Sequence, residues 1–127
     1  MMKRTTALIA ATAVAVPGAL LLAAPAAHAD VDRYGSIARG SWEFSVDRED
    51  GGFEVDLDVD RVAPGTTWRV VLRHDGKRVL ARTLRADHEG DVDVDVWRPN
   101  TPGNDTFRFN LRNTRSGAKA SSTITVR

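Results

Sequence analysis

The sequence contains no cysteine, and aromatic residues make up only 6% of its 127 residues. Without cysteine the chain can form no disulfide, carry no lipid anchor on an N-terminal thiol and use no thiolate nucleophile. A folded domain of this chain must therefore be held together by burial of apolar side chains and by hydrogen bonds alone.

Common catalytic patterns are also missing. There is no Gly-x-Ser-x-Gly nucleophile elbow, no His-x-x-x-His pair and no phosphate-binding glycine loop. His74 lies beside a predicted turn and His88 in a predicted loop, so we expect both to be solvated. We therefore expect no enzymatic activity and no cofactor.

The acidic runs resemble metal-binding loops only at their first positions. Asp56, Asp58 and Asp60 begin like a calcium loop, but Arg61 replaces the glycine at position six and Thr67 replaces the glutamate at position twelve. On a strand, carboxylates two residues apart lie about 7 Å from each other, which is too far to enclose one ion. We expect no metal site.

The N-terminus has the features of an export signal. Lys3 and Arg4 precede an apolar run over residues 7–22, and Ala27-His28-Ala29 has the small-x-small pattern of a cleavage site. We expect residues 1–29 to be removed, leaving residues 30–127 as one domain, secreted and no longer attached to the membrane. The alternative is an uncleaved anchor, which the break at Pro17-Gly18 disfavours.

The rest of the chain alternates apolar and polar residues in short segments separated by turn residues. This period of two, without a sustained helical period, predicts β-strands. The expected strands are 36–47, with a break at Gly40, then 53–60, 68–74, 78–84, 91–96, 106–112 and 118–127. Trp42 and Trp68 fall on the inward positions, and Trp68 should be the largest buried side chain. Trp97 falls on an outward position, where packing under the adjacent proline-rich loop is favoured over a role as a binding platform.

The strongest local signal is Asp75-Gly76 between two alternating segments, because a two-residue type I′ turn needs positive φ at both central positions. Such a turn would place His74 opposite Lys77 and fix the register of the whole hairpin. The predicted buried pairs are Leu72 with Val79, Val70 with Ala81, and Trp68 with Thr83. The predicted exposed pairs are Arg73 with Arg78, Val71 with Leu80, and Arg69 with Arg82.

About seven amphipathic strands are expected to pack as a two-sheet antiparallel β-sandwich. Trp68 on the third strand, Pro64-Gly65 before it and a tight hairpin after it resemble an immunoglobulin-like or fibronectin type III-like domain. That resemblance implies that the first, second and fifth predicted strands share one sheet, and that the other four share the second. The bias toward Ala, Arg, Asp and Val also resembles small exported actinobacterial proteins, which implies an extracytoplasmic location and no known activity.

Net charge is uninformative at +1, but acids and bases are segregated along the chain. Residues 43–60 carry eight acids and one base, and residues 69–85 carry six bases and one acid. With the implied connectivity, one sheet would have an acidic outer face and the other a basic one. The predicted acidic face comprises Asp56, Asp58, Asp60, Asp91, Asp93 and Asp95. A simpler explanation is that alternating strands merely need polar outer residues.

Two functions fit this pattern. The first is a non-catalytic binding module whose basic face engages an anionic polymer of the cell envelope or an acidic protein surface. The second is a structural protein that self-associates through its acidic and basic faces. Neither requires a nucleic-acid partner, and we expect none. The candidate binding residues are Arg69, Arg73, Arg78, Arg82, Val71 and Leu80.

Overall fold

The computed structural model describes residues 30–127, which form eight β-strands and no helix. The predicted export signal, residues 1–29, lies outside the described residues. Within the described part of the chain, no helix is long and apolar enough to cross a membrane. The strands are β2 (Val31–Ile37), β3 (Gly40–Glu49), β4 (Gly52–Asp60), β5 (Thr67–His74), β6 (Lys77–Arg85), β7 (Val92–Pro99), β8 (Asp105–Asn113) and β9 (Lys119–Val126).

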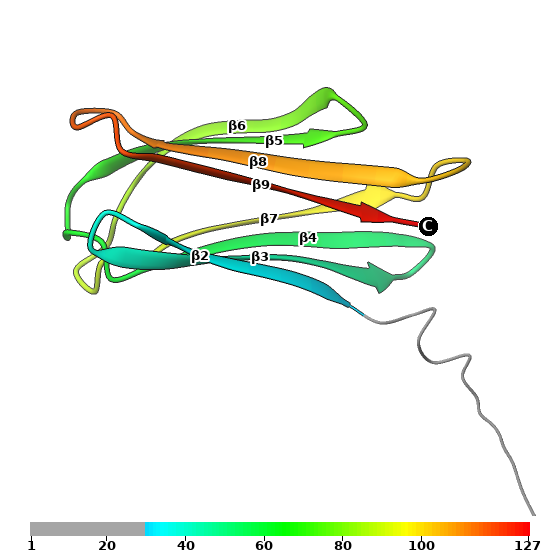
Figure 1. Ribbon diagram of the computed structural model, residues 1–127, viewed down its shortest axis with the longest axis horizontal. Coiled ribbons are helices and arrows are strands. Elements are labelled where there is room, and N and C mark those ends of the chain that lie inside the picture. The colour runs from blue at the N-terminus through cyan, green and yellow to red at the C-terminus, as the bar shows by residue number, and fades with distance from the viewer. Residues whose placement is uncertain (1–29) are drawn as a thin grey trace, which may run out of the picture.

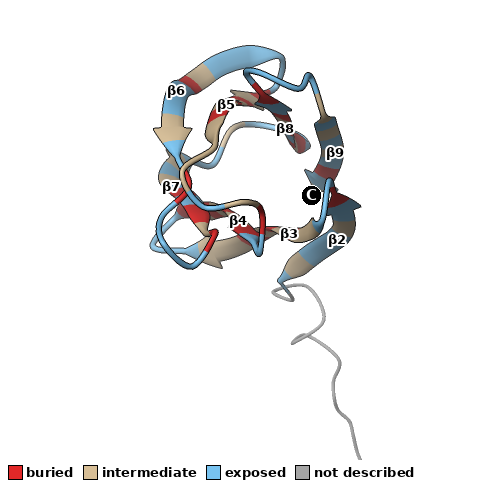
Figure 2. Ribbon diagram, turned by 90° about the vertical axis from the view of Figure 1, so that its left-hand side faces the viewer, coloured by how far each residue is buried: buried red, intermediate tan, exposed pale blue. Residues whose placement is uncertain are grey.

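The strands form two antiparallel sheets of four strands each, stacked as a β-sandwich (Figure 1). One sheet has the order β2-β3-β4-β7, and the other has the order β6-β5-β8-β9. The predicted division of strands between two sheets is therefore confirmed. At the sides of the sandwich, β2 lies beside β9 and β6 lies beside β7, which covers the sheet edges (Figure 2).

The predicted count of seven strands was wrong, because residues before Gly40 form a strand of their own. β2 and β3 make a hairpin whose turn contains Ala38, with φ of 52°. Gly40 starts β3 where a Cβ atom would lie 2.1 Å from the carbonyl oxygen of Asp60. The expected break at Gly40 is thus the site where the chain reverses, and no larger residue fits there without a backbone shift.

Alternation places one apolar face of each sheet in the space between the two sheets. Trp68 is the largest fully buried side chain, as predicted, and Trp42 is also buried. Trp42 and Phe44 from one sheet both contact the ring of Phe109 from the other, with centroids 4.9 Å apart in each pair. These edge-to-face contacts join the sheets at the centre of the core.

The turn at Asp75-Gly76 is confirmed, with φ of 51° and 83°, but the predicted register holds only next to it. His74 pairs with Lys77 and Arg73 pairs with Arg78, and a bulge then shifts the partners by one residue. Beyond the bulge Leu72 pairs with Leu80, Val71 with Ala81, Val70 with Arg82, Arg69 with Thr83, and Trp68 with Leu84. The shift has a physical reason, since it moves Leu80 from the outer face into the core beside Leu72.

Trp97 is 44% exposed, in agreement with its outward position. Its indole Nε1 donates a hydrogen bond to the carbonyl oxygen of Glu49 at 3.0 Å. A Cβ atom on Gly52 would lie 2.5 Å from the indole ring, so Gly52 leaves the space that this ring occupies. Trp97 therefore packs on the turn between β3 and β4.

Candidate functional site

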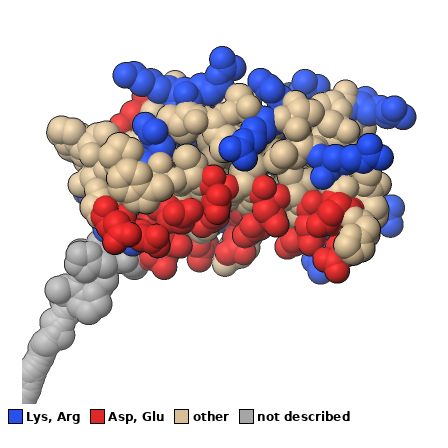
Figure 3. Space-filling model, turned by 180° about the vertical axis from the view of Figure 1, so that it is seen from behind, with Lys and Arg blue, Asp and Glu red and all other residues tan. Residues whose placement is uncertain are grey.

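The outer surface of the β6-β5-β8-β9 sheet carries a concentration of positive charge. In Figure 3 most of the blue side chains lie over one layer of the sandwich and most of the red side chains lie over the other. We define the basic face as the six cationic residues that pairing places outward on this sheet: Arg69, Arg73, Arg78, Arg108, Arg112 and Lys119.

The cations of the basic face form two rows across the strands, because paired residues on neighbouring strands point to the same side. In the first row Arg73 on β5 pairs with Arg78 on β6 and with Arg108 on β8. We call these three residues the first rung. In the second row Arg112 on β8 pairs with Arg69 on β5 and with Lys119 on β9. We call these the second rung.

An uncharged row separates the two rungs. Val71 pairs with Ala81 and Asn110, and Asn110 pairs with Ser121. Each rung is two residues from this row along the strands, so the rungs lie about 13 Å apart at about 3.3 Å per residue. An open depression of about 780 Å³ spans this region. It is lined by Arg69, Val71, Arg73, Arg108, Asn110, Leu111, Arg112, Lys119, Ala120 and Ser121.

Neutral side chains accept hydrogen bonds from two of the three arginines of the first rung. Arg73 donates to Oδ1 of Asn110 at 3.2 Å, and Arg108 donates to Thr123 at 3.0 Å and to Ser121 at 3.2 Å. Within residues 30–127, no Lys or Arg nitrogen lies within 4.0 Å of an Asp or Glu oxygen. The positive charge of this face is therefore arranged without an anionic partner from the described chain.

Two of the predicted site residues do not belong to the basic face. Leu80 is buried in the core, because the bulge turns it inward. Arg82 pairs with Val70, whose side chain points inward, and β6 is an edge strand. Arg82 therefore lies at the sheet edge and lines a small cavity of about 170 Å³ with residues of the β2-β3-β4-β7 sheet: Asp56, Asp58, Asp93, Val94 and Asp95.

The predicted acidic face exists on the outer side of the β2-β3-β4-β7 sheet. Asp58 pairs with Asp93, and Asp56 pairs with Asp95. Asp60 is the last residue of β4, and Asp91 directly precedes β7. Further acids that alternation places outward lie on the same face, among them Glu43, Asp47 and Glu54 and, on β2, Asp32, which pairs with Ser45 in the row of Asp56. Their outward positions follow from alternation, as does that of Lys119, so the signal was present in the sequence.

Crowding of carboxylates changes their ionisation. Partial burial, followed by the charges of Glu54 and Asp95, raises the pKa of Asp56 to about 6. Partial burial and the neighbouring Asp58 raise the pKa of Asp93 to about 6. One oxygen from each of Glu54, Asp56 and Asp95 can lie within 4.8 Å of the others, a spacing that a cation could bridge.

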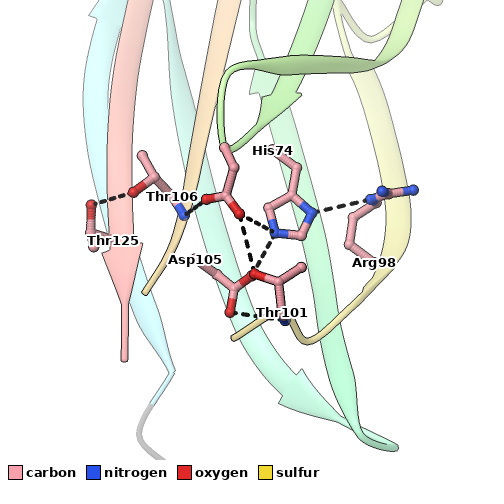
Figure 4. A network of polar contacts seen from close by, with 7 residues as sticks. His74, Arg98, Thr101, Asp105, Thr106 and Thr125 are labelled. Atoms are coloured by element: carbon pink, nitrogen blue, oxygen red, sulfur yellow. Dashed lines mark hydrogen bonds and ion pairs between the residues drawn. The ribbon is translucent and has the colours of Figure 1, made fainter. Parts of the chain in front are cut away.

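A second polar cluster lies at the tip of the β5–β6 hairpin (Figure 4). His74 was expected to be solvated, but it is only 4% exposed and stacks on Phe107 with ring centroids 4.4 Å apart. Its Nε2 lies 2.7 Å from Oδ1 of Asp105, and Arg98 donates to its Nδ1 at 3.3 Å. The expectation failed because inward alternation continues through His74, whose polar atoms find partners on other elements.

This cluster fixes the hairpin to β8. Asp105 is 1% exposed and accepts a hydrogen bond from the hydroxyl of Thr101. The backbone amide of Asp75 donates to the carbonyl of Thr106 at 2.7 Å, and the amide of Thr106 donates to the Asp75 carboxylate at 2.8 Å. Ligand atoms of His74, Asp75 and Asp105 lie within 4.8 Å of one another, as a metal site would require. However, Arg98 donates to Nδ1 of His74, so Nδ1 is the acceptor nitrogen and the ring proton lies on Nε2. Nε2 then donates to Asp105, which favours a structural role for His74 over metal binding.

A scan against protein-family models and searches of curated proteins and of solved structures found no match to this chain.

Proposed function

We propose that this protein is an exported, non-catalytic binding module whose basic face engages an anionic polymer of the envelope or an acidic protein surface. The observation that carries the proposal is that, within residues 30–127, no Asp or Glu oxygen lies within 4.0 Å of a nitrogen of the six cations of this face. A protein that needed only polar outer residues would gain by mixing the two signs of charge within each sheet.

The cost of this arrangement supports a binding role. Like charges directly opposite each other on a sheet are destabilising by a few tenths of a kcal/mol per pair. The basic face contains four such pairs: Arg73 with Arg78, Arg73 with Arg108, Arg69 with Arg112, and Arg112 with Lys119. A bound anion would remove the repulsion and accept charge-assisted hydrogen bonds from the guanidinium groups.

Salt-dependent retention on immobilised heparin tests this proposal. The protein should elute at a lower salt concentration when Arg69 and Arg112 are replaced by Thr. The matched control replaces Arg33 and Arg39, exposed arginines of the other sheet's first hairpin, and removes the same net charge. Equal elution shifts in the two variants would show that net charge alone governs retention, against a defined binding face.

The second candidate is a structural protein that self-associates through its two charged faces. It is favoured by the acidic rows, since Asp58 pairs with both Glu43 and Asp93 in a row of three acids that matches a rung of three cations. Stacking the basic face of one copy on the acidic face of the next is a heterologous contact that can propagate.

Light scattering across ionic strength and pH separates the two candidates. Self-association should weaken with salt, and it should also weaken from pH 8 to pH 5 as Asp56 and Asp93, whose pKa values are about 6, lose charge. Polyanion binding by the arginines should not fall with acidification. A monomer at low salt and pH 8 would exclude assembly.

We also propose an immunoglobulin-like or fibronectin type III-like fold and a location outside the cytoplasm. The sheet orders β3-β4-β7 and β6-β5-β8-β9 are those expected of an immunoglobulin-like or fibronectin type III-like sandwich, with β2 added at one edge. Such a sandwich, exported through a cleaved signal, would present the basic face to polymers outside the cytoplasm.

A further inference from the structure

We propose that the basic face recognises a linear polymer of phosphate groups that lies along the strands and bridges the two rungs. This inference rests on the proposed binding function and specifies the ligand. It follows from the spacing of the rungs, from the charge within each rung and from the uncharged row between them.

The spacing sets the length of the ligand. Arg73 and Arg69 lie on the same face of β5, four residues apart, and Arg108 and Arg112 have the same separation on β8. The rungs are therefore about 13 Å apart along the strand direction. A single small anion can contact only one rung, whereas an extended chain of anions can contact both. Once the chain is bound to one rung, its contact with the second rung is intramolecular, which raises the overall affinity.

The charge within a rung favours phosphate. Each rung gathers three cations from three neighbouring strands, and five of the six are arginines, whose paired N–H donors suit phosphate oxygens. An extended acidic peptide presents carboxylates on one face only about every 7 Å, so it would place about one charge on each rung. A polyphosphate chain carries a charge on every phosphorus and can neutralise several cations of a rung together.

The row between the rungs leaves a path for the chain. Val71 and Asn110 are half-buried at its centre, and the depression of about 780 Å³ runs from Arg73 and Arg108 past them to Arg69 and Lys119. None of the described residues that line this depression carries a carboxylate. A polymer passing from one rung to the other would therefore meet no opposing charge.

Titration with size-fractionated linear polyphosphate, and with orthophosphate as the single-group ligand, tests the inference. Affinity should rise by about two orders of magnitude once the chain is long enough to reach both rungs. A first-rung variant, Arg73→Thr with Arg108→Thr, and a second-rung variant, Arg69→Thr with Arg112→Thr, should each lose this rise. The control Arg33→Thr with Arg39→Thr, which leaves both rungs intact, should keep it.

The outcomes separate this inference from the proposed function. Affinity that increases smoothly with chain length, and equally in every variant, would overturn bridging while leaving a polyanion-binding face in place. Equal or tighter binding of polyglutamate of matched charge would overturn the choice of phosphate. Failure of the wild-type protein to bind heparin, polyphosphate and polyglutamate would overturn both. Circular dichroism and melting curves confirm that each variant is folded.

Discussion

Trp68 lies near the start of the β5–β6 hairpin and packs in the core. It is 1% exposed, and its indole Nε1 donates to Oγ1 of Thr66 at 2.9 Å. Truncation of a large buried aromatic costs about 3 to 5 kcal/mol, and a domain of this size has about 5 to 10 kcal/mol in total. Trp68→Ala should therefore be barely folded in urea titrations. Trp97→Ala, which removes a half-exposed indole, should lose less than half as much, and a near-wild-type curve for Trp68→Ala would contradict its place in the core.

Asp105 makes stability depend on pH in the acid range. Burial acts to raise the pKa of Asp105, but hydrogen bonds from Thr101 and His74 outweigh it and hold the pKa below the usual 3.8. A lowered pKa in the folded state contributes stability above the unfolded value, and this contribution is lost as pH falls through the folded pKa. We expect the free energy of unfolding to drop below about pH 3.8 and Asp105→Asn to show a shallower drop. Asp50→Asn, in an exposed turn, is the control, and an equal acid slope in wild type and Asp105→Asn would contradict this role.

At the scale of elements, the turn and the burial of Leu80 together determine the register of the β5–β6 hairpin. The Asp75-Gly76 turn fixes the first two pairs, and burial of Leu80 then determines the bulge. The bulge separates Arg69 from Arg82, but β8 supplies Arg112 as a new partner for Arg69. Like-charge pairing on this face is thus set by β8 more than by the hairpin itself.

Arg73 pairs with two other arginines, Arg78 on β6 and Arg108 on β8, and we expect this repulsion to lower the stability of the fold. Replacing Arg73 and Arg78 by Thr removes two like-charge pairs, each worth a few tenths of a kcal/mol, and introduces a residue that favours strands. The variant should melt higher than wild type at low salt and bind polyanions more weakly. Both differences should shrink as salt rises, since the Debye length is about 10 Å at 0.1 M. Lower stability at every ionic strength would show that these arginines stabilise the fold.

At the scale of the whole molecule, the acidic face makes stability depend on pH above the acid range. The raised pKa of about 6 for Asp56 and Asp93 means that the folded state binds protons more readily than the unfolded chain. That contribution is full below the usual 3.8 and is lost as pH rises through about 6. After solvent screening we expect about 1 kcal/mol or less from each carboxyl, or a few degrees in Tm between pH 5 and pH 8.

The variant Asp56→Asn with Asp93→Asn checks this effect. It should be more stable than wild type at pH 8 and should show a flatter Tm profile between pH 5 and pH 8. Asp50→Asn should leave the profile unchanged. A double variant that is less stable than wild type at pH 8 would mean that the carboxylates are stabilised by a bound cation or another partner.

Cleavage of the predicted export signal would determine which residues the mature protein contains. From the Ala27-His28-Ala29 pattern we expect the mature protein to begin at Asp30. Intact-mass measurement of the protein from culture supernatant should give the mass of residues 30–127. A mass that includes Met1 or Met2 would instead support the uncleaved anchor.

The sequence by itself determined seven of the eight strands in residues 30–127, the inward and outward faces of these strands except β6, the Asp75-Gly76 turn and the presence of an acidic and a basic face. These features depend on local backbone preference and on a period of two, both of which can be followed along the chain. The tertiary structure alone decided the bulge beside Leu72, the burial of His74 and the partners of Arg69 and Arg82. Each of these depends on which residues from distant strands share the core or the sheet, because burial of Leu80 and satisfaction of His74 by Asp105 and Arg98 are contacts that no local pattern encodes.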